Sequence, residues 1–208
     1  MRRVLLLGST GLVGRELLTM LLDDPTISHV TTIVRRASGV PHPKLAEHVI
    51  PMTELDRHAS LFAVDQIFCA LGTTIKVAGS QEAFRFVDHD LPVTAARLGR
   101  ANGATHYLLV SALGANASSR IFYNRVKGET ERDVIAAGFP SVTIAQPSLL
   151  LGDRKERRLG EDLAKPFGWL MPPKYKPIHV RDVARALVEA ARVNAPGVRV
   201  LESREMRR

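Results

Sequence analysis

A tyrosine and a lysine four residues apart offer the clearest chemistry in this sequence. Tyr123 and Lys127 lie in a segment whose pattern predicts a helix over 121–137, where residues at this spacing share a face. A tyrosine hydroxyl is a poor acid or base at neutral pH, because its usual pKa is about 10. A neighbouring ammonium favours the phenolate and eases proton transfer. The two residues predict an acid/base pair; the alternative is an ordinary exposed helix face.

A serine completes this candidate catalytic set. Ser111 directly follows a predicted strand over 106–110 and precedes Tyr123 by 12 residues. Ligands of parallel sheets bind beyond the carboxyl ends of the strands, so Ser111 can reach the same site as Tyr123. A serine hydroxyl can hold a substrate carbonyl oxygen while hydride is transferred.

Three glycines near the N-terminus predict a site for a dinucleotide. Gly8, Gly11 and Gly14 lie between an apolar run at 3–7 and a helical pattern at 14–22. The first allows a tight turn, the second a close approach of backbone N–H groups to pyrophosphate, and the third close packing of helix on strand. The spacing G-x-x-G-x-x-G differs from the standard G-x-G-x-x-G. A plain tight turn is the alternative, but the position after the first strand favours cofactor binding.

The end of the second predicted strand, 29–34, indicates which dinucleotide binds. Arg35 and Arg36 follow it, and no acidic residue is nearby to hold a ribose 2′-hydroxyl. Guanidinium groups bind phosphate through paired hydrogen bonds. We therefore predict that NADP(H) is preferred over NAD(H), unless both arginines are merely solvated.

The elements that must position these residues alternate along the chain. Apolar runs predict strands at 3–7, 29–34, 47–51, 66–71, 106–110, 141–145 and 198–201, and helices at 14–22, 83–102, 121–137 and 180–193. The helix from Ala83 either continues past Pro92 or restarts there. This order predicts an α/β fold, a doubly wound parallel sheet of the NAD(P)-binding Rossmann type with a minimal C-terminal substrate lobe, as one domain over 1–208. The irregular segment 152–177 is longer than an ordinary connector and is predicted to face the substrate.

The amino-acid composition limits the classes of ligand and partner that the protein can be expected to bind. The net charge of +8 suits a ligand with several phosphates, whereas 5% aromatic residues and dispersed charge argue against nucleic acid. The single cysteine excludes an internal disulfide and predicts a cytoplasmic protein, and no apolar run is long enough for a membrane span. The histidines lack metal-site spacing, so no metal is expected. A homodimer through helices is compatible with the fold.

The segment 152–177 carries two further features with open interpretations. A basic cluster is either a solvated face or an attractant for an anionic substrate, and two aromatic residues are either substrate contacts or a dimer patch. The residues concerned are Arg154, Lys155, Arg157 and Arg158 for the cluster, and Phe167 and Trp169 for the aromatic pair.

Several stretches carry a family resemblance in addition to the glycine turn and the Tyr-x-x-x-Lys motif. They are 68–74 (FCALGTT), Val87-Asp88, Gln146-Pro147-Ser148 and Gly152-Asp153-Arg154. With them, nearly the whole chain resembles an atypical short-chain dehydrogenase/reductase, related to the extended epimerase-like enzymes. The glycine turn and Tyr-x-x-x-Lys are shared across a large superfamily, while the Leu-Gly-Thr-Thr segment is more specific.

The resemblance implies a role for each matching residue. Tyr123 would be the acid/base, Ser111 its helper, and Lys127 would also bind the nicotinamide ribose. The implied cofactor contacts are Gly8, Ser9, Thr10, Gly11, Leu12, Val13 and Gly14 at the phosphates, Ala70, Leu71, Gly72 and Thr73 at the adenosine and its ribose, and Pro147, Ser148 and Leu149 at the nicotinamide. The superfamily often adds an asparagine, but the candidate region 87–90 reads Val-Asp-His-Asp, so the resemblance does not extend to the complete proton relay.

Three functions are compatible with these observations. The first is an NADP(H)-dependent oxidoreductase acting on a carbonyl or alcohol of an unidentified small molecule. The second is a non-catalytic NADP(H)-sensing regulatory protein with a protein partner, since the group that the chain resembles includes a protein known for partner interactions. The third is an epimerase or dehydratase of nucleotide-sugars, for which the chain is short. The sequence does not identify the substrate.

Overall fold

A parallel sheet forms the centre of the computed structural model, which describes residues 1–152 and 176–207. The sheet has seven strands in the order β3-β2-β1-β4-β5-β6-β9, and every neighbouring pair is parallel. The strands are β1 (Arg2–Leu7), β2 (Ile27–Val34), β3 (Leu45–Val49), β4 (Gln66–Cys69), β5 (His106–Val110), β6 (Ser141–Gln146) and β9 (Gly197–Glu202). This order is that of a doubly wound nucleotide-binding fold and confirms the predicted fold class.

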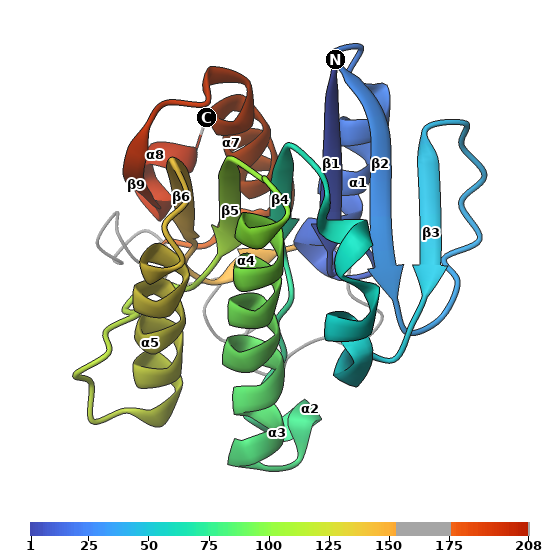
Figure 1. The fold of residues 1–208 in the computed structure, drawn as a ribbon. Helices are drawn as coiled ribbons and strands as arrows, with labels where there is room; N and C mark the ends of the chain where they lie inside the picture. The colour runs from blue at the N-terminus through green and yellow to red at the C-terminus, as the bar shows by residue number, and fades with distance from the viewer. Residues whose placement is uncertain (153–175, 208) are drawn as a thin grey trace.

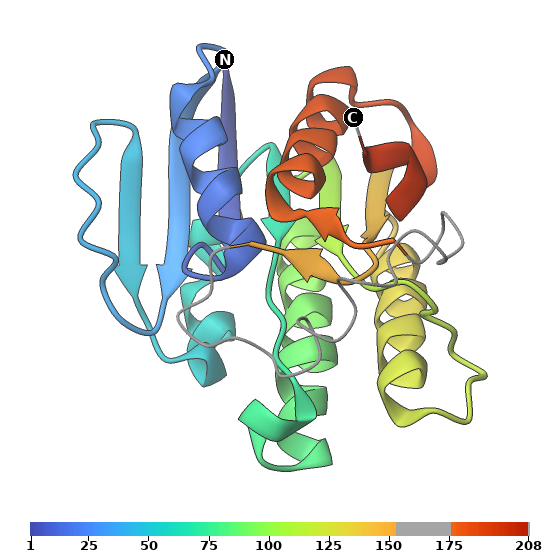
Figure 2. The same ribbon diagram turned by 180° about the vertical axis from the view of Figure 1, so that it is seen from behind.

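Helices cover both faces of the sheet. Figure 1 shows α4 and α5 on the near face, and Figure 2 shows α1 and α7 on the opposite face. The helical segments are α1 (Leu12–Asp23), η1 (Met52–Phe62), α2 (Ile75–Ala78), α3 (Gln81–Arg85), η2 (Phe86–Asp90), α4 (Leu91–Ala101), α5 (Phe122–Ala136), α7 (Val180–Val193) and α8 (Ser203–Met206). None of the helices in residues 1–152 and 176–207 has the length and apolar character to cross a membrane.

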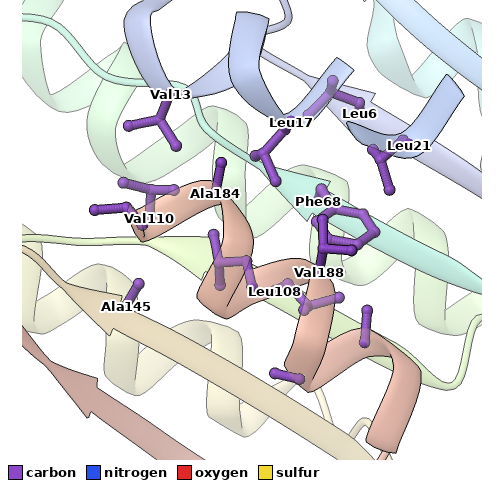
Figure 3. Close-up of a cluster of buried hydrophobic side chains, with 14 of the residues drawn as sticks. Leu6, Val13, Leu17, Leu21, Phe68, Leu108, Val110, Ala145, Ala184 and Val188 are labelled. Carbon is purple, nitrogen blue, oxygen red and sulfur yellow. The ribbon is translucent and has the colours of Figure 1, made fainter. Parts of the chain in front are cut away.

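Two apolar cores follow from the alternation of side chains along the strands. In β1, Val4 and Leu6 pack under α1 and α7, whereas Leu5 and Leu7 pack under η1 and α4. All four side chains are fully buried, which explains why this strand is a continuous apolar run. Figure 3 shows the first core, where Leu6 and Leu17 lie close to Phe68 and Val188.

The order of the strands places a crevice beside the glycine turn. Chain connections run outward in opposite directions from β1 and from β4, which are neighbours in the sheet. Ligands of open parallel sheets bind at such a switch point, outside the carboxyl ends of the strands. Gly8, Ala70 and Ser111 directly follow β1, β4 and β5, so all three lie at this edge.

The helix that includes Pro92 continues through it by a π-turn. Proline has no N–H to donate to the carbonyl four residues earlier, which here belongs to Asp88. The chain forms the π-helical turn η2 over this stretch, and the Thr130 hydroxyl of α5 lies 2.8 Å from the Asp88 carbonyl oxygen and donates to it. Of the two predicted arrangements, the structure therefore has the continuous helix, and the π-turn fixes where Asp88 points.

Other local features were not predicted from the sequence. A second, two-stranded sheet pairs β7 (Leu150–Leu151) with β8 (Ile178–His179), and η1, α2 and α8 were not expected. Strand β3 begins two residues earlier than predicted, at Leu45, because its pairing with β2 starts there. In the predicted substrate-side segment 152–177, residues 153–175 lie outside the described residues, and so do the basic cluster at 154–158, Phe167 and Trp169.

Candidate active site

The glycine turn is built by three close backbone approaches. Gly8 has a φ of +82°, and a Cβ on it would lie 2.5 Å from the Ala70 carbonyl oxygen. A Cβ on Gly14 would lie 1.9 Å from the carbonyl oxygen of Gly8, so the helix can approach the strand only without a side chain there. The Gly11 N–H donates to the Gly8 carbonyl at 3.0 Å and closes the turn.

The residues of this turn fit the pyrophosphate of a dinucleotide. Helix α1 starts after Gly11 with neither a side-chain cap nor an acidic residue in its first turn, so its N–H groups can serve an anion. The hydroxyl of Ser9, a residue only 2% exposed, has no hydrogen-bond partner among the described residues. A buried polar atom without a partner suits a site completed by a polar ligand. Thr10 is exposed beside it, and Leu12 and Val13 begin the helix.

The two arginines follow β2 at the same edge of the sheet. Leu7 pairs with Ile33, so Arg35 and Arg36 lie just beyond the level of the glycine turn. Both arginines are exposed. Their guanidinium groups are therefore available to a ligand that lies across the carboxyl ends of β1 and β2.

Lys127 forms a buried ion pair with Asp88. Its Nζ lies 2.7 Å from Asp88 Oδ1, and the two side chains are 7% and 0% exposed. Burial disfavours the ammonium, but the charge of Asp88 and a smaller contribution from Tyr123 outweigh it, so the pKa of Lys127 is raised above its usual value. Lys127 thus remains charged at neutral pH.

The loop after β4 is attached to this ion pair. The Thr73 N–H donates to Asp88 Oδ2 at 2.8 Å. A Cβ on Gly72 would lie 3.5 Å from Asp88 Oδ1 and 3.9 Å from Lys127 Nζ. Ala70 meets the glycine turn at the other end of the loop, with Leu71 between. The structure thus places the predicted adenosine-side loop between the glycine turn and Lys127.

Tyr123 lies on the first turn of α5, among aromatic rings. The Phe84 ring of α3 lies 5.5 Å from the ring of Tyr123 and 5.7 Å from that of Phe122. The loop that follows β5 packs directly on the helix, because a Cβ on Gly128 would lie 2.1 Å from the Ala117 nitrogen. The first half of α5 is therefore contacted by α3 near Tyr123 and by the loop after β5 at Gly128.

Ser111 is joined to α5 through Glu131. Its hydroxyl donates a short hydrogen bond to Glu131, and the Gln146 amide nitrogen lies 3.0 Å from each carboxylate oxygen of the same residue. Burial raises the pKa of Glu131, and the hydrogen bonds from Ser111 and Gln146 oppose this rise. Glu131 follows Lys127 by four residues, so Tyr123, Lys127 and Glu131 form one stripe on α5.

The predicted nicotinamide-side residues follow β6. Pro147 is buried, and its carbonyl accepts from the Leu113 N–H at 2.9 Å, which links the ends of β5 and β6. Ser148 Oγ lies 2.5 Å from the carbonyl oxygen of Lys176 and 2.8 Å from Ser203 Oγ, so this hydroxyl binds protein groups. Leu149 accepts a backbone bond from Ile178 at 2.9 Å.

Sequence reasoning missed the two acids at this site. Asp88 appears in the sequence analysis as part of a family-like stretch and of the region that lacks an asparagine, but without a role, and Glu131 does not appear there. A signal existed for Glu131 in its spacing from Lys127, whereas the pairing of Asp88 with Lys127 depends on how η2 packs against α5. The described part of the chain contains no group of three His, Cys, Asp or Glu side chains suited to a metal ion.

The chain is similar to known proteins over most of its length. The sequence profile of a family described as NAD(P)H-binding matches residues 8–193. The Candida albicans protein FMP52, mitochondrial, is 32% identical over 204 residues, covering 92% of this chain and 89% of that protein. Protein HTATIP2 of Rattus norvegicus is 35% identical over 178 residues, covering 84% and 73%. Among solved structures, the Bordetella bronchiseptica enzyme WbmH in complex with NAD+ has a TM-score of 0.75 at 15% identity, covers 98% of this chain and 76% of that chain, and shows the fold alone.

These relatives correct one prediction and settle the family. The expectation of a cytoplasmic protein is wrong, because several FMP52 relatives are named as mitochondrial proteins. The single cysteine could not decide between compartments, since Cys69 is buried and unpaired and fits any reducing environment. The chain belongs to the NAD(P)H-binding family and is related to FMP52 and HTATIP2, which is consistent with its resemblance to atypical short-chain dehydrogenases/reductases.

Proposed function

We propose that this chain is an NADP(H)-dependent oxidoreductase that interconverts a carbonyl and an alcohol on a small molecule. The observation that carries the proposal is the stripe on α5. Tyr123 lies one turn before a buried, charged lysine, and the next turn is hydrogen-bonded to Ser111 at the end of β5. An exposed helix face would not need a buried ammonium at this place.

Each of these residues has a task that its surroundings support. Tyr123 donates the proton to the carbonyl oxygen, and the charge of Lys127 stabilises the phenolate that remains. Asp88 holds the ammonium beside the tyrosine. Ser111 hydrogen-bonds the substrate oxygen and orients the carbonyl. The reduced nicotinamide, when bound, supplies the hydride.

Replacement of Tyr123 by phenylalanine tests this assignment. We expect kcat for reduction of an aldehyde panel that includes 4-nitrobenzaldehyde to fall by about 10²–10⁴, the range for loss of an acid/base group. The Kd for NADPH should not change, because the phenyl ring is kept. Loss of NADPH absorbance measures the rate, and calorimetry measures the Kd.

A matched control removes another tyrosine hydroxyl. Tyr107 is buried in β5 and donates to the Pro92 carbonyl at 2.8 Å. Tyr107→Phe should lose about 1–3 kcal/mol of stability, the usual effect of a buried acceptor left without its partner, and keep its turnover. Equal turnover in wild type and Tyr123→Phe would contradict the proposed mechanism.

The preference for NADP(H) rests on Arg35 and Arg36. The double variant Arg35→Ala/Arg36→Ala should bind NADPH about 10–100-fold more weakly, since hydrogen bonds to charged groups contribute roughly 1.5–3 kcal/mol. NADH binding should change little, because NADH lacks the 2′-phosphate. The control Arg57→Ala/Arg97→Ala removes two other exposed arginines and the same charge. Equal affinity of wild type for NADPH and NADH would exclude this preference.

The same measurements separate the other two functions. Tight NADPH binding without turnover of any carbonyl would favour the regulatory, cofactor-sensing protein. Turnover confined to nucleotide-sugars would favour the epimerase or dehydratase.

A further inference from the structure

Glu131 controls the one proton that Ser111 can offer. A hydroxyl has one donor and two acceptor positions, whereas an ionised carboxylate only accepts. In the structure the Ser111 hydroxyl donates to Glu131 Oε1. While Glu131 is ionised, this proton is committed, and Ser111 cannot also donate to a substrate carbonyl.

A protonated Glu131 reverses this arrangement without moving any heavy atom. The carboxylic acid then donates to Ser111 Oγ, and the serine proton is free to point at the substrate oxygen. Gln146 Nε2 lies 3.0 Å from both oxygens of Glu131 and can donate to whichever accepts, so it supports either state.

The burial of Glu131 favours uptake of the proton, and the neighbouring groups do not overcome it. Burial raises its pKa, against hydrogen bonds from Ser111 and Gln146 and the charge of Lys127. Lys127 lies on α5 itself and is paired with Asp88 of η2, which compensates its charge. The groups that reach Glu131 from β5 and β6 are the neutral side chains of Ser111 and Gln146.

We propose that Glu131 is a positioning residue whose protonation decides whether Ser111 donates to the substrate oxygen, so that carbonyl reduction uses the protonated form. No proton leaves Glu131 in the reaction, because only the direction of two hydrogen bonds changes. The proposal rests on the proposed function, in which Ser111 contacts the substrate oxygen.

The variant Glu131→Gln imitates the protonated acid. Its amide N–H can donate to Ser111 Oγ, and its oxygen can accept from Gln146. With 4-nitrobenzaldehyde and NADPH, wild-type kcat/KM should fall about tenfold per pH unit above the midpoint of Glu131, and Glu131→Gln should lack this fall. One pH unit above that midpoint, kcat/KM of Glu131→Gln should be about tenfold higher than that of wild type. The control Glu129→Gln changes the same residue type on the same helix, where Glu129 pairs with Arg85 at 2.5 Å, and should titrate like wild type.

A measurement without substrate keeps the two proposals distinguishable. Carboxyl NMR of protein labelled with [13C]glutamate should show one resonance that titrates above the ordinary range and is missing in Glu131→Gln. In Ser111→Ala its midpoint should rise further, because the carboxylate loses a donor. An unchanged midpoint in Ser111→Ala, or a pH-dependent fall that persists in Glu131→Gln, would overturn the proposal. If the Glu131 midpoint rises in Ser111→Ala as expected but the wild-type protein reduces no aldehyde, the proposed function would be overturned instead. The substrate role of Ser111 would then be overturned with it.

Discussion

Replacement of Asp88 by alanine is expected to lower the free energy of unfolding by about 3–5 kcal/mol, the effect of leaving one partner of a buried ion pair without the other. Lys127 would stay buried without the carboxylate that stabilises its charge, and the Thr73 N–H would lose its acceptor. Urea denaturation at neutral pH measures the change. The control Asp56→Ala breaks the exposed pair with Arg97 and should change stability by less than about 1 kcal/mol.

The stability difference between wild type and Asp88→Ala should decrease as the pH rises. In wild type the pKa of Lys127 is raised, so the stability from the pair is present at neutral pH and is lost as the pH rises through that raised value. In Asp88→Ala burial is no longer opposed by the carboxylate, so the neutral amine is favoured. The difference between the two proteins should therefore shrink toward alkaline pH. A stability loss below 1 kcal/mol, or one that grows with pH, would contradict the role given to Asp88.

Two further variants separate charge from shape. Asp88→Asn keeps the shape of the side chain but offers one carbonyl oxygen to two donors, the Thr73 N–H and Lys127. Its free energy of unfolding should therefore lie between those of wild type and Asp88→Ala. The pair replacement Asp88→Ala/Lys127→Met removes the buried charge and should recover much of the stability, because apolar replacements of buried pairs are often neutral. The asparagine that the superfamily often uses would therefore not substitute fully for Asp88 here.

Replacement of Gly14 by alanine is expected to weaken cofactor binding strongly and to destabilise the fold. The new Cβ would lie 1.9 Å from the Gly8 carbonyl oxygen. This oxygen belongs to the backbone, so a change of side-chain rotamer cannot relieve the clash. Helix α1 must then move away from β1, which should cost about 1–3 kcal/mol or more. The same movement takes the N–H groups of α1 out of the turn, so NADPH affinity should fall by at least about 100-fold, measured by calorimetry on folded protein.

Gly11→Ala provides a graded comparison in the same turn. Its Cβ would lie 3.3 Å from the same oxygen, so small local shifts can accommodate it. Stability should stay within about 1 kcal/mol of wild type, while NADPH binding weakens because the methyl group borders the anion site. Equal behaviour of the two variants would contradict the assignment of Gly14 to helix–strand packing.

Local residue patterns predicted the seven strands of the main sheet, the long helices and the glycine turn. Strand β5 and helix α7 have the predicted bounds, because a strand buried on both faces and a helix with one apolar face leave a local periodic pattern. The turn was predictable because only glycine permits the approaches at Gly8 and Gly14. The alternation of strands and helices predicted a doubly wound parallel sheet, whereas the order of its strands is known only from the structure.

The polar partners at the candidate site depend on how distant elements pack, which local residue patterns do not show. Asp88 meets Lys127 because Pro92 removes a helical hydrogen bond, a π-turn forms, and Thr130 satisfies the freed carbonyl. Ser111 meets Glu131 because β5 and α5 are packed so that the second turn after Tyr123 faces the strand end. Such contacts depend on how elements far apart in the chain are packed against each other, and no local pattern of residues encodes that packing.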